Sequence, residues 1–425
     1  MRVLLLGATG FIGRHIAAHL LRQGHELVAG VRDIASARRR FPGIATAFVD
    51  MNRMGTPADW LPLLTGIEGV VNCAGILQSG RGDDADAIHA AAPKALFDAC
   101  VSAGVRRVVQ ISAVSADDAA GTTYARTKKA ADDHLRSLDL EWVVLRPSLV
   151  YAQGSFGGTS TLRGLAGFPL VTPVIGDGGQ KFQPIHADDL AETVSRCLSD
   201  PKLARQTLDP VGPDTLSLKD LLGMLRAWLD LPAAPLLRLP MGTAKLLAKF
   251  GDLTGQGPMR TTALEQMNYG NVSDPIGFES AIGFRPRTMT DALRDAPSHV
   301  QDRWHARLYF LRPPLTLILI LLWLGSGIAG LLNPPPGGEL ILAKLGLPPI
   351  AADLFCMLDL GIAAGLILGW RPHLLGLIQL AVVGSYTLGI GALEPALWAD
   401  AYGPLLKNLP ILAAIAAWLA LLDDK

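Results

Sequence analysis

Four long apolar runs near the end of the chain constrain its fold more than any other feature. They cover residues 315–332, 350–370, 373–393 and 405–422. Each is close to the ~20 residues that an α-helix needs to cross the hydrocarbon of a bilayer. We therefore expect an all-α, four-helix transmembrane domain over residues 313–425, so that the lipid bilayer is the first predicted partner.

The earlier part of the chain alternates short apolar strands with helical patterns. Strands are predicted at residues 3–6, 26–31, 45–49, 69–72, 107–112 and 141–146, with helices at 12–23, 85–103 and 123–138. This alternation predicts an α/β domain with a parallel sheet over residues 1–150. Residues 151–298 contain more glycine and proline, and they are expected to form a small substrate lobe interleaved with the first domain. Gly24 and Gly104 stand where helices end, and Ser217 is placed to cap a helix over 218–229.

Residues 299–312 are charged and contain interleaved aromatic side chains. They predict a juxtamembrane helix at the lipid surface, with an ordinary amphipathic linker helix as the alternative. Arginines dominate one side of the spans and the other side carries lysines and acids, as the positive-inside rule describes. We expect both termini and the nucleotide domain to be cytoplasmic, in an inner or cell membrane. The residues used for this orientation are Arg303, Arg307, Arg312 and Arg371 against Lys344 and Lys407.

The overall charge gives no sign of a nucleic-acid partner. The chain has 38 basic and 38 acidic residues, whereas nucleic-acid-binding domains are usually basic. The four cysteines have neither metal-ligand nor disulfide-framework spacing, so no metal site is predicted.

Three glycines after the first strand form the most specific local signal. Gly7, Gly10 and Gly13 follow the apolar residues 3–6 and open a helical pattern. In this context the first glycine allows a tight turn, the second lets a pyrophosphate approach, and the third lets the helix pack on the sheet. The phosphates then bind to free N–H groups at the helix start. The chain is therefore expected to bind a dinucleotide.

The residue after the second strand suggests which dinucleotide is bound. An arginine at that position pairs with the 2′-phosphate of NADP, whereas an acid would bind the ribose hydroxyl of NAD. Arg32, together with Arg14, favours NADP(H) over NAD(H). Asp33 keeps some use of NAD open, and a solvated surface arginine is the alternative for Arg32.

Further motifs appear in order along the first 300 residues. They include Asp50, Asn72-Cys73-Ala74-Gly75, Tyr124 with Lys128, Arg146-Pro147-Ser148, residues 176–178, 183–184 and 186–190. Together with the glycine loop they resemble the short-chain dehydrogenase/reductase superfamily. The closest branch is the extended or atypical one, which is epimerase/dehydratase-like and related to the 39-kDa-type accessory subunit of respiratory complex I. Residues 405–410 resemble part of the DoxX-like membrane family.

The resemblance implies a Rossmann-type doubly wound sheet and assigns roles to residues. Asp50 would contact the adenine, residues 72–75 would line the cofactor, and Pro147 would lie beside the nicotinamide carboxamide. The expected cofactor-binding residues are Gly7, Thr9, Gly10, Phe11, Ile12, Gly13, Arg14, Arg32, Asp50, Met51, Asn72, Ala74, Gly75, Tyr124, Lys128 and Pro147.

Tyr124 and Lys128 are the expected catalytic pair. Their spacing of four places them on one face of a helix. The ammonium and the cofactor's positive ring are expected to lower the pKa of Tyr124, which would then exchange a proton while hydride moves. Lys128 would also hold the ribose hydroxyls.

One position departs from the family pattern. The family places a serine or threonine after the fifth strand to orient the substrate, and Ala113 stands there in this chain. Ser112 is the candidate substitute, with Ser115 as the alternative. Without such a hydroxyl, the site would bind cofactor and react slowly or not at all.

For several other polar residues, both a structural and a functional role are considered. His186 with Asp188 and Asp189 could form a metal or acid–base site, but a structural role is favoured. Cys73 could be a redox thiol, and packing is favoured. Asp353 and Asp359 fall in the second apolar run, where charges are costly. Asp353 could lie at the interface, and Asp359 could be functional or could join helices.

Two functions follow. The first is a membrane-anchored NADP(H)-dependent oxidoreductase acting on a lipophilic carbonyl, alcohol or quinone-like substrate. The second is a non-catalytic NAD(P)H-binding scaffold or sensor for a membrane redox complex.

Overall fold

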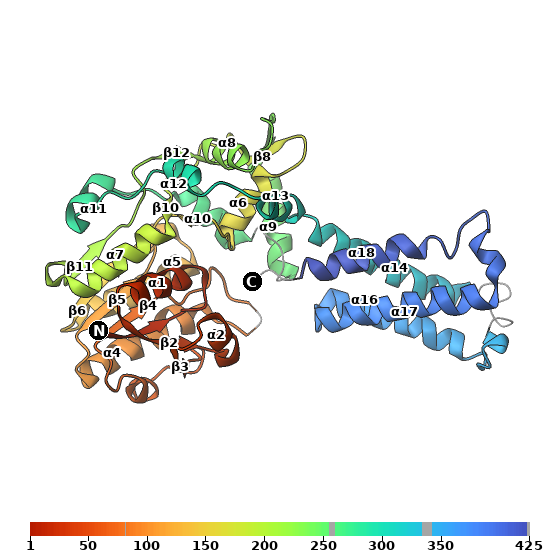
Figure 1. Ribbon diagram of the computed structural model, residues 1–425, viewed down its shortest axis with the longest axis horizontal. Coiled ribbons are helices and arrows are strands. Elements are labelled where there is room, and N and C mark those ends of the chain that lie inside the picture. Colours follow the sequence, from red (N-terminus) through yellow and green to blue (C-terminus); the bar gives the residue numbers. More distant parts are fainter. Residues whose placement is uncertain (81, 255–259, 334–341, 423–425) are drawn as a thin grey trace. The chain divides into compact units, whose positions relative to one another are not determined.

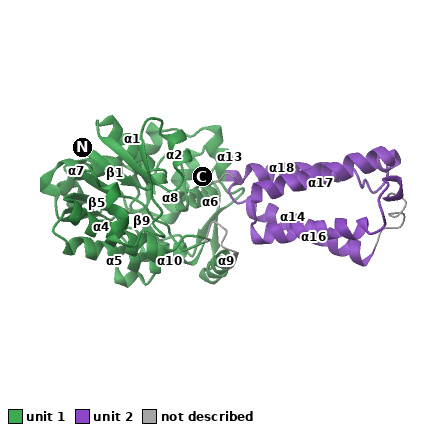
Figure 2. Ribbon diagram, turned by 90° about the horizontal axis from the view of Figure 1, so that it is seen from below, with its two compact units in different colours: residues 1–306 green, residues 307–425 purple. Residues whose placement is uncertain are grey.

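The computed structural model describes residues 1–80, 82–254, 260–333 and 342–422. Two compact units are present, Met1–Ala306 and Arg307–Lys425, coloured separately in Figure 2. Each unit is described by itself below.

The first unit is built on a seven-stranded parallel sheet. The strand order is β11-β6-β5-β4-β1-β2-β3, and every neighbouring pair is parallel. All six strands predicted from the sequence are confirmed, and β11 is an additional short edge strand from the later part of the chain. The strands are β1 (Arg2–Leu6), β2 (Glu26–Val31), β3 (Ala45–Phe48), β4 (Gly69–Asn72), β5 (Arg107–Ile111), β6 (Glu141–Leu145) and β11 (Gln206–Leu208).

Both faces of the sheet are buried, as a doubly wound fold requires. Val3 and Leu5 of β1 belong to one hydrophobic cluster, and Leu4 and Leu6 belong to the other. The first face is covered by α1 (Phe11–Arg22), α2 (Ile34–Arg40) and α7 (Ala187–Ser199), with α1 against α7 (Figure 1). The second face is covered by α3 (Pro57–Trp60), α4 (Ala92–Ala103) and α5 (Thr123–Ser137), with a π-helical turn Ala87–Ala91 before α4.

The order of connections determines where a ligand can bind. The chain leaves β1 toward one face through α1 and leaves β4 toward the other through α4, although β1 and β4 are neighbours. In open α/β sheets, ligands bind at such a switch point, outside the carboxyl ends of the strands. The glycine loop, residues 72–75 and the start of the segment after β5 all lie at that edge.

The remaining elements of the first unit form a second lobe. It keeps the name substrate lobe below, and its role in binding a substrate remains a prediction. Ser217 caps α8 as predicted, and the Asp220 side chain accepts a hydrogen bond from the backbone N–H of Ser217, which completes a capping box. Gly24 and Gly104 have positive φ angles at helix ends, also as predicted. The lobe contains β7 (Val150–Tyr151), α6 (Gly158–Ala166), β8 (Thr172–Ile175), β9 (Lys181–Phe182), β10 (Ile185–His186), β12 (Leu216–Ser217), α8 (Leu218–Trp228), β13 (Leu236–Leu239), α9 (Met241–Thr254), α10 (Thr261–Tyr269), α11 (Pro275–Ile282) and α12 (Met289–Asp295).

The predicted juxtamembrane segment contains α13 (Val300–Leu308). Its residues pack on α6: Arg163 lies 3.5 Å from Asp302, and Ala306 lies so close to Gly167 that a Cβ there would come within 2.7 Å. Most of α13 is therefore docked on the substrate lobe, which favours a linker helix.

The second unit consists mainly of four helices. They are α14 (Arg312–Leu332), α16 (Ala351–Leu368), α17 (Pro372–Leu393) and α18 (Asn408–Ala420). The first three are long and apolar enough to span a membrane, whereas α18 has 13 residues. Three candidate spans are therefore found in the described residues. The expected fourth span and the orientation of the domain remain predictions.

A candidate nucleotide and catalytic site

The glycine loop after β1 has no room for larger side chains, so its backbone can approach the pyrophosphate of a dinucleotide closely. Gly7 has a φ of +75°, and a Cβ on Gly13 would lie 2.0 Å from the Gly7 carbonyl oxygen. Gly10 is the N-cap of α1, and no side chain caps this helix. The N–H groups of Phe11, Ile12 and Gly13 have no partner within the helix, so this end offers an anion site with a favourable dipole.

Two arginines converge on the carbonyl oxygen of Thr9, beside this loop. The donor–acceptor distances are 3.5 Å from Arg14 and 3.2 Å from Arg40. Burial and the nearby Arg40 guanidinium lower the pKa of Arg14. Among the described residues, no carboxylate lies within ion-pairing distance of either. This uncompensated positive charge, next to the end of β2, suits a phosphate group.

Arg32 is engaged differently from what the sequence suggested. Its guanidinium forms an ion pair with Asp83, which also lies 3.3 Å from the Asn52 amide. Part of its charge is therefore neutralised within the protein. Arg40 was missed by the sequence analysis, although the run of arginines in the last turn of α2 was a visible signal.

The ends of β3 and β4 are shaped by short polar contacts. Asp50 accepts a hydrogen bond from the backbone N–H of Asn52 at 3.2 Å, and Met51 is buried. Asn72 donates to Gln110 at 2.8 Å and accepts from the N–H of Ala74 at 3.2 Å. The second contact fixes the turn that leads to Gly75.

Tyr124, Lys128 and Asp132 form a stripe along one face of α5. Lys128 is buried, and its Nζ donates to the carbonyl oxygen of Ile111 at 2.9 Å. A Cβ on Gly75 would lie 3.2 Å from that Nζ. The structure therefore places the end of β4 beside the Lys128 ammonium.

The environment of Tyr124 differs from the expectation in one respect. Burial, followed by the negative charge of Asp132, raises the pKa of Tyr124 to about 12. The predicted lowering of this pKa is therefore wrong for the protein's own groups. Lys128 does not supply it because its ammonium is directed to the Ile111 carbonyl and balanced by Asp132. Tyr124 is held in its protonated form.

The Ser112 hydroxyl is occupied by a contact within the protein. It donates to Asp132 Oδ2 at 2.5 Å, and both residues are buried. Burial raises the pKa of Asp132 to about 6, against the opposing effects of Ser112 and Lys128. The other carboxylate oxygen, Oδ1, is buried and has no hydrogen-bond partner among the described residues. The sequence analysis missed Asp132, whose signal was its position four residues after Lys128.

His89 is a second buried residue that the sequence analysis missed. Its Nε2 accepts from the N–H of Ile76 at 3.0 Å, so its Nδ1 carries the hydrogen and faces Thr127 at 3.1 Å. Burial and Lys128 lower the pKa of His89 to about 2, which keeps it neutral. Its ring also meets Tyr124 edge-on at 5.4 Å. His89 thus connects the β4 loop to α5.

The polar residues for which both a structural and a functional role were considered make contacts within the protein. His186 caps α7 by accepting a hydrogen bond from the backbone N–H of Asp188. The carboxylate of Asp188 lies 2.7 Å from His15 Nδ1. Asp189 pairs with Arg287 at 2.8 Å. Burial raises the pKa of Cys73 to about 12, so its thiol stays protonated. These contacts favour the structural roles.

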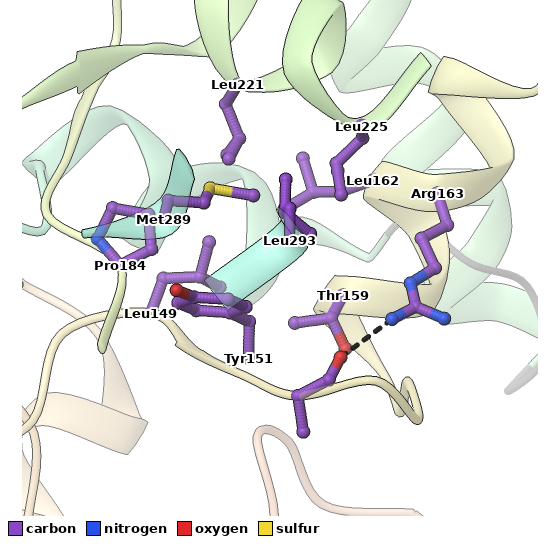
Figure 3. A pocket seen from close by; sticks show the side chains of 11 residues that line it. Leu149, Tyr151, Thr159, Leu162, Arg163, Pro184, Leu221, Leu225, Met289 and Leu293 are labelled. Carbon is purple, nitrogen blue, oxygen red and sulfur yellow. Dashed lines mark hydrogen bonds between the residues drawn. The ribbon is translucent and has the colours of Figure 1, made fainter. Parts of the chain in front are cut away.

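A small apolar pocket lies in the substrate lobe. Its wall comes from α6, α8, α12 and the segment around β7, and leucine is the commonest residue in it (Figure 3). Arg163 lines one side, donating to the Ala152 carbonyl at 2.7 Å and stacking on Trp228 at 4.7 Å. Pro147, buried just before this segment, accepts a hydrogen bond from the N–H of Val114 at 3.2 Å. The pocket is therefore largely apolar, and Arg163, the one cation in its lining, is already engaged.

The chain is similar in sequence to several curated proteins. The chain is 28% identical to the ceramide reductase of Caulobacter vibrioides over 213 residues, which are 50% of this chain and 65% of that protein. It is 24% identical over 315 residues, 71% of this chain, to the mouse mitochondrial protein NADH dehydrogenase (ubiquinone) 1 alpha subcomplex subunit 9, covering 81% of it. The chain thus spans slightly less than two thirds of the reductase.

Solved structures support the fold of the first unit. The UDP-N-acetylglucosamine 4-epimerase of Bacillus cereus matches with a TM-score of 0.53 at 15% identity, covering 72% of this chain and 99% of that one. The dTDP-glucose 4,6-dehydratase of Bacillus anthracis, in complex with NAD, matches with a TM-score of 0.54 at 13% identity, covering 74% and 99%.

Two family matches divide the chain in the same way as the structure. Residues 7–201 match the family described as NAD(P)H-binding, and residues 320–416 match the DoxX-like family. The chain therefore combines an NAD(P)H-binding domain of the epimerase/dehydratase-like Rossmann type with a C-terminal DoxX-like membrane domain.

Proposed function

We propose that the protein is a membrane-anchored NADP(H)-dependent oxidoreductase that interconverts a lipophilic carbonyl compound and its alcohol. The observation that carries this proposal is the stripe on α5, where Tyr124 and Lys128 lie at the sheet edge that holds the glycine loop. Within the NAD(P)H-binding fold, this edge is where the nicotinamide would meet a substrate.

Tyr124 is suited to act as an acid in the reducing direction. Since its pKa is raised to about 12, it carries a proton at neutral pH and can give it to a carbonyl oxygen. The nicotinamide cofactor would supply or accept the hydride. Lys128 would hold the ribose, and Asp132 with Ser112 would position Lys128.

The cofactor preference rests on Arg14 and Arg40, with Arg32 in a supporting role. Their guanidinium groups match a phosphate in charge and geometry. Gly7, Gly10, Gly13 and the first N–H groups of α1 would hold the pyrophosphate, and Asp50, Asn72, Ala74 and Gly75 would line the rest of the cofactor.

The substrate class rests on three features. The DoxX-like domain and its apolar helices associate the chain with a membrane, where lipophilic molecules concentrate. The pocket of the substrate lobe is lined mainly by apolar side chains, of which five are leucines. One curated relative is a ceramide reductase. A long-chain lipid ketone therefore fits better than a small sugar.

The test uses the full chain purified in detergent. The nucleotide that co-purifies is identified first, and NADPH absorbance is then followed with a long-chain keto-lipid, a short-chain quinone and a short aldehyde. We expect oxidation of NADPH with the keto-lipid or quinone, and little with the aldehyde. Tight NADPH binding without turnover on any of the three would reject the enzyme proposal.

That result would support the alternative, a non-catalytic NAD(P)H-binding scaffold or sensor of a membrane redox complex. Ala113 and the engaged Ser112 hydroxyl favour this alternative, because neither offers a hydroxyl to a substrate. The similarity to a subunit of NADH dehydrogenase also supports it. The direct test would then be to isolate the protein from native membranes and to determine whether other proteins of a redox complex co-purify with it.

A further inference from the structure

The interior of the DoxX-like domain contains two polar side chains near the middle of their helices. Asp359 lies halfway along α16 and is 6% exposed, and Gln379 of α17 is 0% exposed. The hydrophobic cluster that fills this unit includes leucine, isoleucine and tryptophan side chains. Ionisable groups at such a depth are costly and usually mark a function.

Both side chains are held by neighbouring positions on α14. Ser326 donates its hydroxyl to Asp359 Oδ2 at 2.7 Å, and the Trp323 indole N–H donates to Gln379 Oε1 at 2.8 Å. Trp323 and Ser326 are three residues apart, so they share one face of the helix. Asp359 and Gln379 therefore lie about one helical turn apart along α14.

Each of the two held side chains leaves one buried polar atom without a partner. These atoms are Asp359 Oδ1 and Gln379 Nε2, and no described residue hydrogen-bonds to either. The first is a carboxyl oxygen and the second is an N–H donor. A pair that only joined helices would have no need for these spare groups, because serine and tryptophan have already made the inter-helix contacts. Leaving them unmade costs free energy.

We propose that Asp359 and Gln379 form a binding site for the head group of an uncharged amphiphile dissolved in the membrane. Such a head group presents a hydroxyl, with or without a nearby carbonyl. An oxygen of the head group accepts a hydrogen bond from Gln379 Nε2. The hydroxyl group of the same head group forms a hydrogen bond with Asp359 Oδ1. Hydroxylated amide lipids and quinols both have this chemistry. All residues of this site belong to the second unit, and the inference holds whether or not the nucleotide domain is catalytic.

The test follows carbodiimide labelling of Asp359 in the full protein, reconstituted in lipid nanodiscs. A hydrophobic carbodiimide adds to a protonated carboxyl group in an apolar setting and remains attached as an N-acylurea, which mass spectrometry locates. The probes are a short-chain ceramide and a short-chain ubiquinol, with a plain alkane of equal chain length as a control. Asp353, at the exposed start of the same helix, is the reference carboxyl.

We expect Asp359 to be labelled and Asp353 to remain largely unlabelled. One of the two hydroxylated probes should slow the labelling of Asp359, which would also identify the source of the head group, and the alkane should not. Gln379→Leu keeps the carboxyl group, so labelling should continue, but the protecting probe should become about tenfold less effective because one hydrogen bond is lost.

Three results would overturn the proposal: no protection by either hydroxylated probe at saturation, equal protection by the alkane, or full protection in Gln379→Leu. Asp359→Asn should abolish the label. If that variant does not assemble, Ser326→Ala provides the second route, because it removes only the contact to Oδ2 and should leave protection within a few-fold of the wild type. NADPH binding by each variant shows that the nucleotide domain is intact.

Discussion

Removal of Arg40 is the most direct test of the cofactor assignment. Its guanidinium bonds to the Thr9 carbonyl at 3.2 Å and lies near Arg14, and within the described part of the chain neither arginine has an ion pair. A hydrogen bond to a charged group contributes about 1.5–3 kcal/mol, which corresponds to roughly a 10- to 150-fold change in affinity. Arg40 is exposed and therefore screened by salt, so we expect the lower end of that range.

Arg40→Ala should therefore weaken NADPH binding about tenfold and leave NADH binding nearly unchanged, because NADH lacks the 2′-phosphate. Titration of both nucleotides by calorimetry, at two salt concentrations, measures the effect. Arg39→Ala is the matched control, since it removes the same charge from an exposed position of the same helix. Asp83→Asn should act in the opposite direction by releasing Arg32 from its ion pair.

Two outcomes would refute this reasoning. One is an equal loss of NADPH affinity in Arg39→Ala, which would mean that only net charge matters. The other is a parallel loss of NADH affinity in Arg40→Ala, which would place the arginine elsewhere on the cofactor.

Three other predictions concern catalysis, pH dependence and topology. Tyr124→Phe should retain NADPH binding and lower turnover by a factor of ~10²–10⁴; steady-state kinetics would contradict the proposed acid if turnover were unchanged. The pKa of Asp132 is raised to about 6 by folding, so the folded state holds this proton more tightly than the unfolded state, and wild-type stability should fall as pH rises from about 4 through about 6. Asp132→Asn should flatten this part of the pH profile of the thermal midpoint, and an unchanged slope would assign it to other groups. With the nucleotide domain cytoplasmic and α18 crossing the bilayer, a reporter fused after residue 425 should be cytoplasmic, and an external reporter would contradict the four-span topology.

The fold was predictable because its signals are local. Most strands of the sheet are short apolar runs. In β1, β2, β4, β5 and β6 residues of both parities are buried, so the pattern can be recognised without knowledge of the neighbouring strands. The glycine loop is similarly local, since Gly7 and Gly13 exclude a Cβ for reasons contained within about ten residues. The edge strand β11 was missed because three residues carry too little pattern.

The site was less predictable because its contacts join distant segments. The pairing of Arg32 with Asp83 and of Ser112 with Asp132 depends on how loops and α5 pack on the strand ends. The protonated state of Tyr124 follows from burial and from Asp132, neither of which is visible from the spacing of Tyr124 and Lys128. His89 could not be singled out, because one histidine on a helix has no local signature.

The short helix α18 has a consequence for the surrounding lipid. With 13 residues and a rise of about 1.5 Å per residue, it covers roughly 20 Å, against about 30 Å of hydrocarbon. A helix of this length crosses only where the bilayer becomes thinner or where another apolar surface covers its ends. The domain should therefore respond to acyl-chain length, with its thermal midpoint higher in nanodiscs of short-chain lipids than in those of long-chain lipids.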